Sequence, residues 1–328
     1  MTEFAALKKL SARVGADPLL VQAAGGNTSL KHEGVMWIKA SGTWLKDAIV
    51  RDIFVPINHK ALQTALAKND PACEACTDFV LPDLNSTGLR PSIETTVHAL
   101  MPQRVVVHVH CVNTIAWAIR SDAKLRLAGK LTDFSWAFIP YARPGLPLAN
   151  VIAPRMKPGI DVLILGNHGL VVAAETVAEA EKLLDRVVKS LTKPVRAAVP
   201  PDIAALHLLC IGTDYAPAEN NETHALATDI FALEKGERSV FYPDHVVFLG
   251  IGVETEIESG AALIALSGKG VLIRKNAKSA IEPMGRCLAD VMRRVEADDP
   301  LIALDPEAID RLVNWDAEKY RQGLNMGV

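Results

Sequence analysis

Two histidines in this sequence have the spacing expected of two ligands to one metal ion. His108 and His110 follow the apolar run 105–107, three valines whose β-branched side chains favour a strand. Successive side chains on a strand point to opposite faces, so the two imidazoles project from the same face. A pair at this spacing can also be two ordinary histidines that are solvated or hydrogen bonded, so a metal site needs further ligands.

A third candidate ligand is His168, which lies in a Gly-Asn-His-Gly turn within the apolar stretch 161–172. Three histidines around one ion, with a vacant position for water or substrate, form a known type of catalytic zinc site. Glu94, near the start of the segment that leads to the histidine pair, is a candidate fourth ligand or general base. Its alternative role is a charge at a helix N-terminus, where the helix dipole favours a carboxylate. His98, one turn later, is expected to be an ordinary helix residue.

Two short polar turns near the N-terminus have the composition of an anion site. Residues 25–29 read Gly-Gly-Asn-Thr-Ser, and residues 40–43 read Ala-Ser-Gly-Thr. Backbone N–H groups and short hydroxyl side chains in such turns can surround a phosphate. Either turn can also be a plain connection, because Gly and Asn favour tight turns without any ligand. The two turns together indicate a phosphate site more strongly than either does alone.

Helices and strands alternate along the part of the chain that carries these residues. The pattern of apolar residues predicts helices over 1–15, 59–68, 93–101 and 175–191, strands over 35–39 and 105–110, and a hairpin over 161–172. Residues 138–145 have the composition of an irregular connection. Prolines at positions 194, 200 and 201 mark a boundary. We therefore expect a catalytic domain over residues 1–197 and a C-terminal α/β domain over residues 198–328.

The composition is that of a soluble globular protein, with 49% hydrophobic and 22% charged residues among 328. A net charge of −3 without a basic block gives no reason to expect nucleic acid, so the partner is expected to be a small molecule.

The N-terminus lacks the apolar core of a signal peptide, and no uncharged apolar run approaches the thickness of a bilayer. Five cysteines, an odd number, suggest reduced thiols, so we expect a cytoplasmic protein that does not bind membranes. Cys73 and Cys76 lack a second pair, and neither a zinc nor a redox role is expected for them.

The C-terminal part contains a faint echo of the N-terminal part. Residues 263–294 align with residues 163–189 as strand, glycine-containing turn, strand and helix, with Lys269 at the position of His168. Residues 222–226 likewise resemble residues 94–100, but no His-x-His motif follows them. The sequence is compatible with a degenerate internal repeat that has lost its metal site, and with a chance resemblance between two α/β units.

Five short motifs occur together in the order and approximate spacing of one known family. They are Gly25-Gly26-Asn27-Thr28-Ser29, Ala40-Ser41-Gly42, Pro91-Ser92-Ile93-Glu94, His108-Val109-His110 and Asn167-His168-Gly169. Over roughly residues 5–195 the chain resembles the class II aldolase/adducin family, which includes the fuculose-1-phosphate and rhamnulose-1-phosphate aldolases. It looks most similar to the aldolase part of the bifunctional rhamnulose-phosphate aldolase/dehydrogenase proteins.

The resemblance implies a fold, a metal site and a reaction. The family fold is a three-layer α/β/α arrangement around a mainly antiparallel sheet, and members usually form homo-oligomeric rings with active sites between subunits. By resemblance, His108, His110 and His168 hold Zn²⁺ or another divalent ion, and Glu94 is the acid/base. The positions that match the family's phosphate site are Gly26, Asn27, Ser41, Gly42 and Ser92. The implied activity is cleavage of a ketose 1-phosphate to dihydroxyacetone phosphate and an aldehyde through an enediolate.

Two departures from the family pattern keep other functions open. Ile93 stands where the fuculose-type enzymes have a second serine, so the phosphate pocket loses one hydroxyl. The tyrosine that protonates the leaving group in some members has no clear counterpart, since Tyr141 lies in a segment that looks structural. Related functions are decarboxylation of a 3-oxo sugar-acid phosphate and epimerisation of a pentulose phosphate. The alternative of another class is a non-catalytic, adducin-like interaction protein, which does not need the metal ligands.

Overall fold

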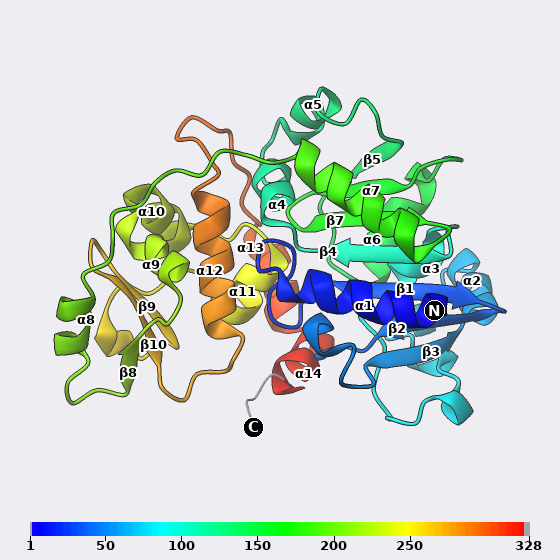
Figure 1. Cartoon of the computed structure of the whole chain (residues 1–328), viewed down its shortest axis with the longest axis horizontal. Helices are drawn as coiled ribbons and strands as arrows, with labels where there is room; N and C mark the ends of the chain where they lie inside the picture. The colour runs from blue at the N-terminus through cyan, green and yellow to red at the C-terminus, as the bar shows by residue number, and fades with distance from the viewer. Residues whose placement is uncertain (1, 325–328) are drawn as a thin grey trace.

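A seven-stranded sheet organises the N-terminal part of the computed structural model, which describes residues 2–324 (Figure 1). Its strand order is β3-β2-β1-β4-β7-β6-β5, and every neighbouring pair is antiparallel except the parallel pair β5 and β6. The strands are β1 (Asn27–His32), β2 (Val35–Lys39), β3 (Phe54–Asn58), β4 (Val105–Val109), β5 (Trp136–Ile139), β6 (Val162–Leu165) and β7 (Gly169–Ala174).

Helices cover both faces of this sheet. On one face lie α1 (Glu3–Ala16) and α7 (Val177–Ser190), seen in front of the sheet in Figure 1. The opposite face is covered by α2 (His59–Ala67), α3 (Thr95–Leu100) and α6 (Leu146–Ile152). In β4, Val105 and Val107 pack into the core between the sheet and helices α1 and α7, and Val106 packs into the core between the sheet and helices α3 and α6. A strand buried on both faces needs a continuous apolar run, which is what residues 105–107 provide. The expected three-layer α/β/α fold is confirmed.

Most of the predicted elements are present, with shifts at their ends. The predicted helix 175–191 is α7, which starts with a capping box between Thr176 and Glu179. The predicted helix from residue 93 begins only at Thr95, and Glu94 takes the N-cap position. Residues 138–145, expected to be irregular, contain the end of the edge strand β5, which stops before Pro140. That strand was missed because four residues are too few to show a period.

The C-terminal part forms a smaller α/β unit around a three-stranded sheet. Its strands, in the order β8-β10-β9, are β8 (Tyr215–Pro217), β9 (Leu263–Leu266) and β10 (Gly270–Arg274). Its helices are α8 (Ile203–Leu209), α9 (Asn221–Thr228), α10 (Ile230–Arg238), α11 (Pro243–Leu249), α12 (Ile281–Met292), α13 (Pro306–Val313) and α14 (Asp316–Leu324). In Figure 1, α12 stands between the small sheet and the large one.

The two parts share a hydrophobic core. The helix α4 (Val112–Ala118), which follows β4 directly, buries Val112 and Ile115 in the same apolar cluster as Leu288 and Val291 of α12. The segment between α7 and α8 contains no helix or strand, and the expected boundary at residue 197 falls within it. The division into two domains stays a prediction, because the second unit packs on a helix of the first.

The hairpin β9–β10 repeats the geometry of the hairpin β6–β7. Leu165 pairs with Gly169 across the first turn, and Leu266 pairs with Gly270 across the second. The order β8-β10-β9 also repeats the antiparallel order β4-β7-β6. However, α9 follows β8 whereas α3 precedes β4, so residues 222–226 do not occupy the place of residues 94–100. The internal repeat stays a prediction that these three strands favour.

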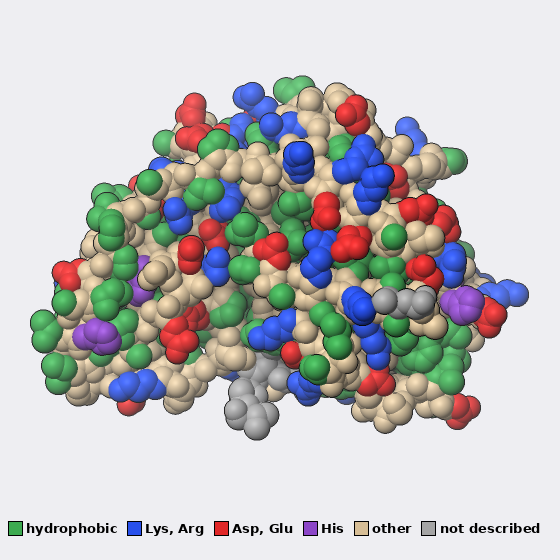
Figure 2. Space-filling model, in the orientation of Figure 1, with side chains coloured by type: hydrophobic (Ala, Val, Ile, Leu, Met, Phe, Trp, Pro, Cys, Tyr) green, Lys and Arg blue, Asp and Glu red, His purple; other side chains and the backbone are tan. Residues whose placement is uncertain are grey.

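Acidic and basic side chains are interspersed over the face seen in Figure 2. Within residues 2–324, no helix combines the length and the apolar character needed to cross a bilayer. All five cysteines are free thiols, and Cys73 and Cys76 are buried, with the Cys76 thiol donating to the Cys73 carbonyl at 3.1 Å.

The buried histidine of α11 predicts a loss of stability in acid. His245 is fully buried, and burial lowers its pKa from 6.5 to about 3. Below pH 6.5 the unfolded chain binds a proton that the folded chain does not, so the free energy of unfolding falls as pH falls. Between pH 7 and pH 5, His245 should account for about 2 kcal/mol of that fall.

The variant His245→Asn isolates this contribution. Its side-chain oxygen can still accept from the Phe241 amide, which faces Nδ1 of His245 at 3.4 Å, but it does not titrate. Urea unfolding gives the free energy of unfolding at pH 7 and at pH 5. The fall in this free energy from pH 7 to pH 5 should be smaller in the variant than in the wild type. The exposed His32→Gln variant serves as the control and should behave as the wild type. Equal differences in His245→Asn and wild type would mean that the folded chain binds this proton.

Candidate metal centre

Four side chains predicted from the sequence converge at one end of β4. His108 lies in β4, His110 follows its last residue, His168 lies in the β6–β7 turn, and Glu94 occupies the N-cap position of α3. All four are buried, and each offers one ligand atom within 4.8 Å of those of the others. The structure therefore brings the three histidines and the carboxylate together.

The turn that carries His168 is fixed by its neighbours in the chain. Asn167 adopts a left-handed conformation (φ 52°), which asparagine tolerates better than most residues, and the His168 amide donates to the Leu165 carbonyl at 3.2 Å. Gly169 follows, and a Cβ there would lie 2.6 Å from the Val109 carbonyl oxygen. A side chain at position 169 would therefore push β7 away from β4 and His168 away from His108.

The hydrogen bonds of His108 and His110 direct their other ring nitrogens at one another. Nδ1 of His108 lies 3.0 Å from the Leu170 carbonyl oxygen, and Nδ1 of His110 lies 2.8 Å from Oδ2 of Asp244. Both partners are acceptors, so both Nδ1 atoms carry a hydrogen, and in the neutral form of each ring Nε2 presents a lone pair. These Nε2 atoms are only 3.1 Å apart.

Glu94 adds further acceptors to the same space. Its Oε2 lies 3.2 Å from Nε2 of His108, and its Oε1 lies 3.3 Å from Nε2 of His168. Lone pairs and a carboxylate that face one another in a buried site repel unless a positive charge lies among them. The donor set of three imidazoles and one carboxylate fits a divalent ion such as Zn²⁺.

The protonation states also suit a metal. Burial lowers the pKa of His168 to about 3, so its imidazole is neutral at pH 7. Neutral imidazoles and an ionised carboxylate are the forms in which these side chains bind metals.

A chain of buried hydrogen bonds orients Glu94. The Asn27 amide nitrogen donates to Oε2 of Glu94 at 2.8 Å and to the Ser92 hydroxyl at 3.1 Å. The oxygen of Asn27 accepts from Nε2 of His98, whose Nδ1 accepts from the Ser29 hydroxyl at 2.7 Å. His98 lies outside the metal group, as expected, but it is not an ordinary helix residue. It fixes the Asn27 amide so that the NH₂ group faces Glu94.

The residues predicted to bind phosphate line one cavity beside the metal group. Gly26, Asn27, Ser41, Gly42 and Ser92 surround it together with Ile93, Glu94, His110 and His168. Tyr141 is not among its lining residues. The cavity measures about 20 Å³, room for about one water molecule, so a sugar phosphate requires the lining to move outward. The phosphate-binding role of these residues stays a prediction.

Four charged residues of this cavity were missed by sequence reasoning: Lys39, Asp244, Glu318 and Arg321. The Lys39 ammonium donates to the carbonyls of Ala24 and Gly26 at 2.8 and 3.0 Å and so holds the glycine turn in place. Burial lowers the pKa of Lys39 to about 7. Its position as an inward residue of β2 was a signal in the sequence, but the other three residues lie in helices far along the chain and gave none.

The helix α14 closes the cavity from outside. It contributes Glu318 and Arg321, which are 2% and 6% exposed. Trp315, which directly precedes α14, and Tyr320 within it lie against cations of the N-terminal part. Arg143 lies 4.1 Å from the ring of Trp315, and Arg90 lies 4.4 Å from the ring of Tyr320. The C-terminal part is therefore a structural component of the site.

Comparison with known proteins gives distant relatives. The uncharacterized oxidoreductase YuxG of Bacillus subtilis (strain 168) is 28% identical over 175 residues, 50% of this chain. The aligned chain spans only 25% of that protein's length.

Similar solved structures cover the N-terminal part. The N-terminal class II aldolase domain of a conserved protein from Thermoplasma acidophilum has 26% identity and a TM-score of 0.49, over 56% of this chain and 90% of that one. The L-fuculose-1-phosphate aldolase from Thermus thermophilus has 17% identity and a TM-score of 0.38, over 64% of this chain and 96% of that one.

The match to a protein family is broader. Residues 7–192 match the family described as Class II Aldolase and Adducin N-terminal domain. The matched range contains all five sequence motifs and the four residues of the metal group, and it covers more than half of the chain. The chain therefore belongs to the class II aldolase and adducin N-terminal domain family.

Proposed function

We propose that this chain is a metal-dependent aldolase that cleaves a ketose 1-phosphate to dihydroxyacetone phosphate and an aldehyde. The observation that carries the proposal is the buried group of Glu94, His108, His110 and His168. It lies beside a cavity lined by hydroxyl groups and by glycine backbone. Family membership supports the reaction class, because the fold and the donor set occur together.

Each part of the site has a task in this reaction. The three histidines would hold a divalent ion, which supplies a Lewis acid for the hydroxy-ketone oxygens of the substrate when bound. Cleavage of the C3–C4 bond transfers a proton overall from the 4-hydroxyl group to C3. Glu94 is the buried carboxylate that can carry this proton, and Asn27 keeps it oriented by donating to Oε2. The turns at residues 26–27 and 41–42 would receive the phosphate.

Two related reactions use the same residues. A decarboxylase of a 3-oxo sugar-acid phosphate needs the same acid/base and metal but loses carbon dioxide instead of an aldehyde. A pentulose-phosphate epimerase re-forms the bond that it breaks. Ile93 at the cavity wall keeps both reactions as candidates, because the missing hydroxyl changes how a phosphate is held. A non-catalytic, adducin-like protein has no need for four converging ligands, and the metal group therefore argues against it.

A substrate screen tests the proposal. Protein loaded with Zn²⁺ should cleave at least one ketose 1-phosphate, with dihydroxyacetone phosphate detected by a coupled reductase. The same preparation stripped with a chelator should be inactive and should recover when Zn²⁺ is returned. A parallel panel of 3-oxo acid phosphates, followed by carbon dioxide release, separates the decarboxylase. Turnover of neither panel by a metal-loaded protein would contradict the aldolase and the decarboxylase.

A further inference from the structure

We propose that Asp244 is a positioning residue for the metal ligand His110, so that the C-terminal part completes the metal site. This inference rests on metal binding by the group proposed above. Asp244 lies in α11, outside the residues 7–192 that match the family. The site therefore depends on a residue that the family match does not include.

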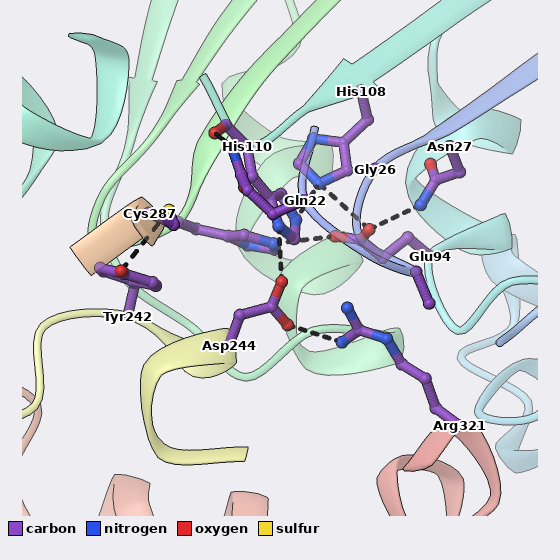
Figure 3. A network of polar contacts seen from close by, with 12 residues as sticks. Gln22, Gly26, Asn27, Glu94, His108, His110, Tyr242, Asp244, Cys287 and Arg321 are labelled. Atoms are coloured by element: carbon purple, nitrogen blue, oxygen red, sulfur yellow. Dashed lines mark hydrogen bonds and ion pairs between the residues drawn. The ribbon is translucent and has the colours of Figure 1, made fainter. Parts of the chain in front are cut away.

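Both carboxylate oxygens of Asp244 are engaged, and each has a different partner. Oδ2 accepts from Nδ1 of His110 at 2.8 Å, and Oδ1 accepts from Nη1 of Arg321 at 2.7 Å. Figure 3 shows Asp244 between the two side chains, with Arg321 reaching it from α14. Asp244 and Arg321 are 3% and 6% exposed. Burial opposes ionisation of Asp244, but Arg321 and His110 outweigh it and lower the pKa of the carboxyl.

The bond from His110 to Asp244 has a defined effect on a ligand. A carboxylate that accepts from Nδ1 fixes the tautomer, limits ring rotation and raises the basicity of Nε2. His108 receives the corresponding support from the backbone carbonyl of Leu170 at 3.0 Å, within the matched domain. Of these two ligands, His110 alone draws its support from the C-terminal part.

Gly25 provides an independent indication that this pair is built into the site. A Cβ at position 25 would lie 2.8 Å from Nδ1 of His110, 2.9 Å from the Gln22 carbonyl oxygen and 3.2 Å from Oδ2 of Asp244. A side chain there would enter the space of the hydrogen bond itself. The absence of a side chain at position 25 therefore allows the His110–Asp244 contact, which is a reason for the first glycine of the turn.

The position of α11 is itself tied to the metal group. The Asn167 amide nitrogen, one residue before His168, donates to the Phe241 carbonyl at 2.9 Å and to the Ile302 carbonyl at 2.8 Å. Phe241 lies two residues before α11 begins. The turn that presents His168 thus also anchors the segment that presents Asp244.

The test measures metal affinity in protein that has been stripped of metal. Zinc titration against a chromophoric chelator should give a dissociation constant about 10- to 100-fold weaker for Asp244→Asn than for the wild type. Asp290→Asn is the matched control, because Asp290 is also buried and paired with arginines but lies in α12. Its zinc affinity should equal that of the wild type, whatever its stability.

A second variant and a wild-type measurement keep the test decisive if Asp244→Asn does not fold. Gly25→Ala should weaken zinc binding in the same range, because its methyl group separates His110 from Asp244. In metal-loaded wild type with ¹⁵N-labelled histidine, the NMR spectrum should contain an Nδ1–H signal from His110. The His110→Ala variant assigns this signal, because the signal is missing from its spectrum. Wild-type affinity in Gly25→Ala, or an unprotonated Nδ1 of His110, would overturn the inference.

The two proposals fail in different ways. A wild-type protein that binds no metal would remove the proposed function. A wild type that binds zinc, with Asp244→Asn within twofold of its affinity, would leave that function intact and refute the positioning role.

Discussion

The variant Glu94→Gln should lose catalytic turnover by about 10²- to 10⁴-fold while it keeps its metal. Glutamine has nearly the same shape as glutamate and can still accept the hydrogen bond that Asn27 donates at 2.8 Å. It cannot take up or return a proton. The loss should therefore be in kcat, measured with the ketose phosphate identified by the screen, and metal content should be measured on the same sample.

The control for this variant is Glu234→Gln, the same chemical change on the exposed face of α10. Its kcat and metal content should match those of the wild type. Full activity in Glu94→Gln would exclude the acid/base role. Loss of both activity and metal would instead make Glu94 a ligand that the ion requires.

The double variant His108→Ala, His110→Ala should contain no bound divalent ion after exposure to Zn²⁺. The wild type should hold about one ion per chain. The variant should hold none, because it lacks two of the three histidine nitrogens proposed to bind the ion. Elemental analysis of dialysed protein gives the content. Zinc at 100 times its dissociation constant should also stabilise the wild type by about 2.7 kcal/mol and the variant not at all.

Exposed histidines supply the comparison for the double variant. His32→Ala, His207→Ala removes the same number of imidazoles from the surface and should retain the ion. An ion that remains in His108→Ala, His110→Ala would mean that the metal lies elsewhere. A wild type without metal, even after zinc is supplied, would favour the interaction-protein alternative.

The residues that could be predicted from the sequence are those whose signal is local. Val105 to Val107 favour a strand through their branching, and the period of a strand then places His108 and His110 on one face. His168 could be placed because glycines on both sides of Asn-His mark a tight turn between apolar strands. The likeness of these motifs to one family placed Glu94 and the phosphate turns in the same site as the histidines, which spacing alone did not do.

Other residues could not be predicted because their contacts cross long stretches of chain. Asp244 lies 134 residues from its partner His110, and Arg321 lies 77 residues from Asp244. A single aspartate after Tyr-Pro in a short helix has no period and no repeated neighbour that would indicate its role. His98 was expected to be ordinary because a helix pattern does not show that a side chain reaches across to Asn27.

The shared carboxylate of Asp244 has a thermodynamic consequence for the whole chain. One oxygen accepts from the proposed ligand His110 and the other from Arg321 of α14, so metal binding at the proposed site and docking of α14 would be linked equilibria. Linkage is reciprocal: by whatever factor docked α14 tightens the metal, the metal favours docked α14 by the same factor.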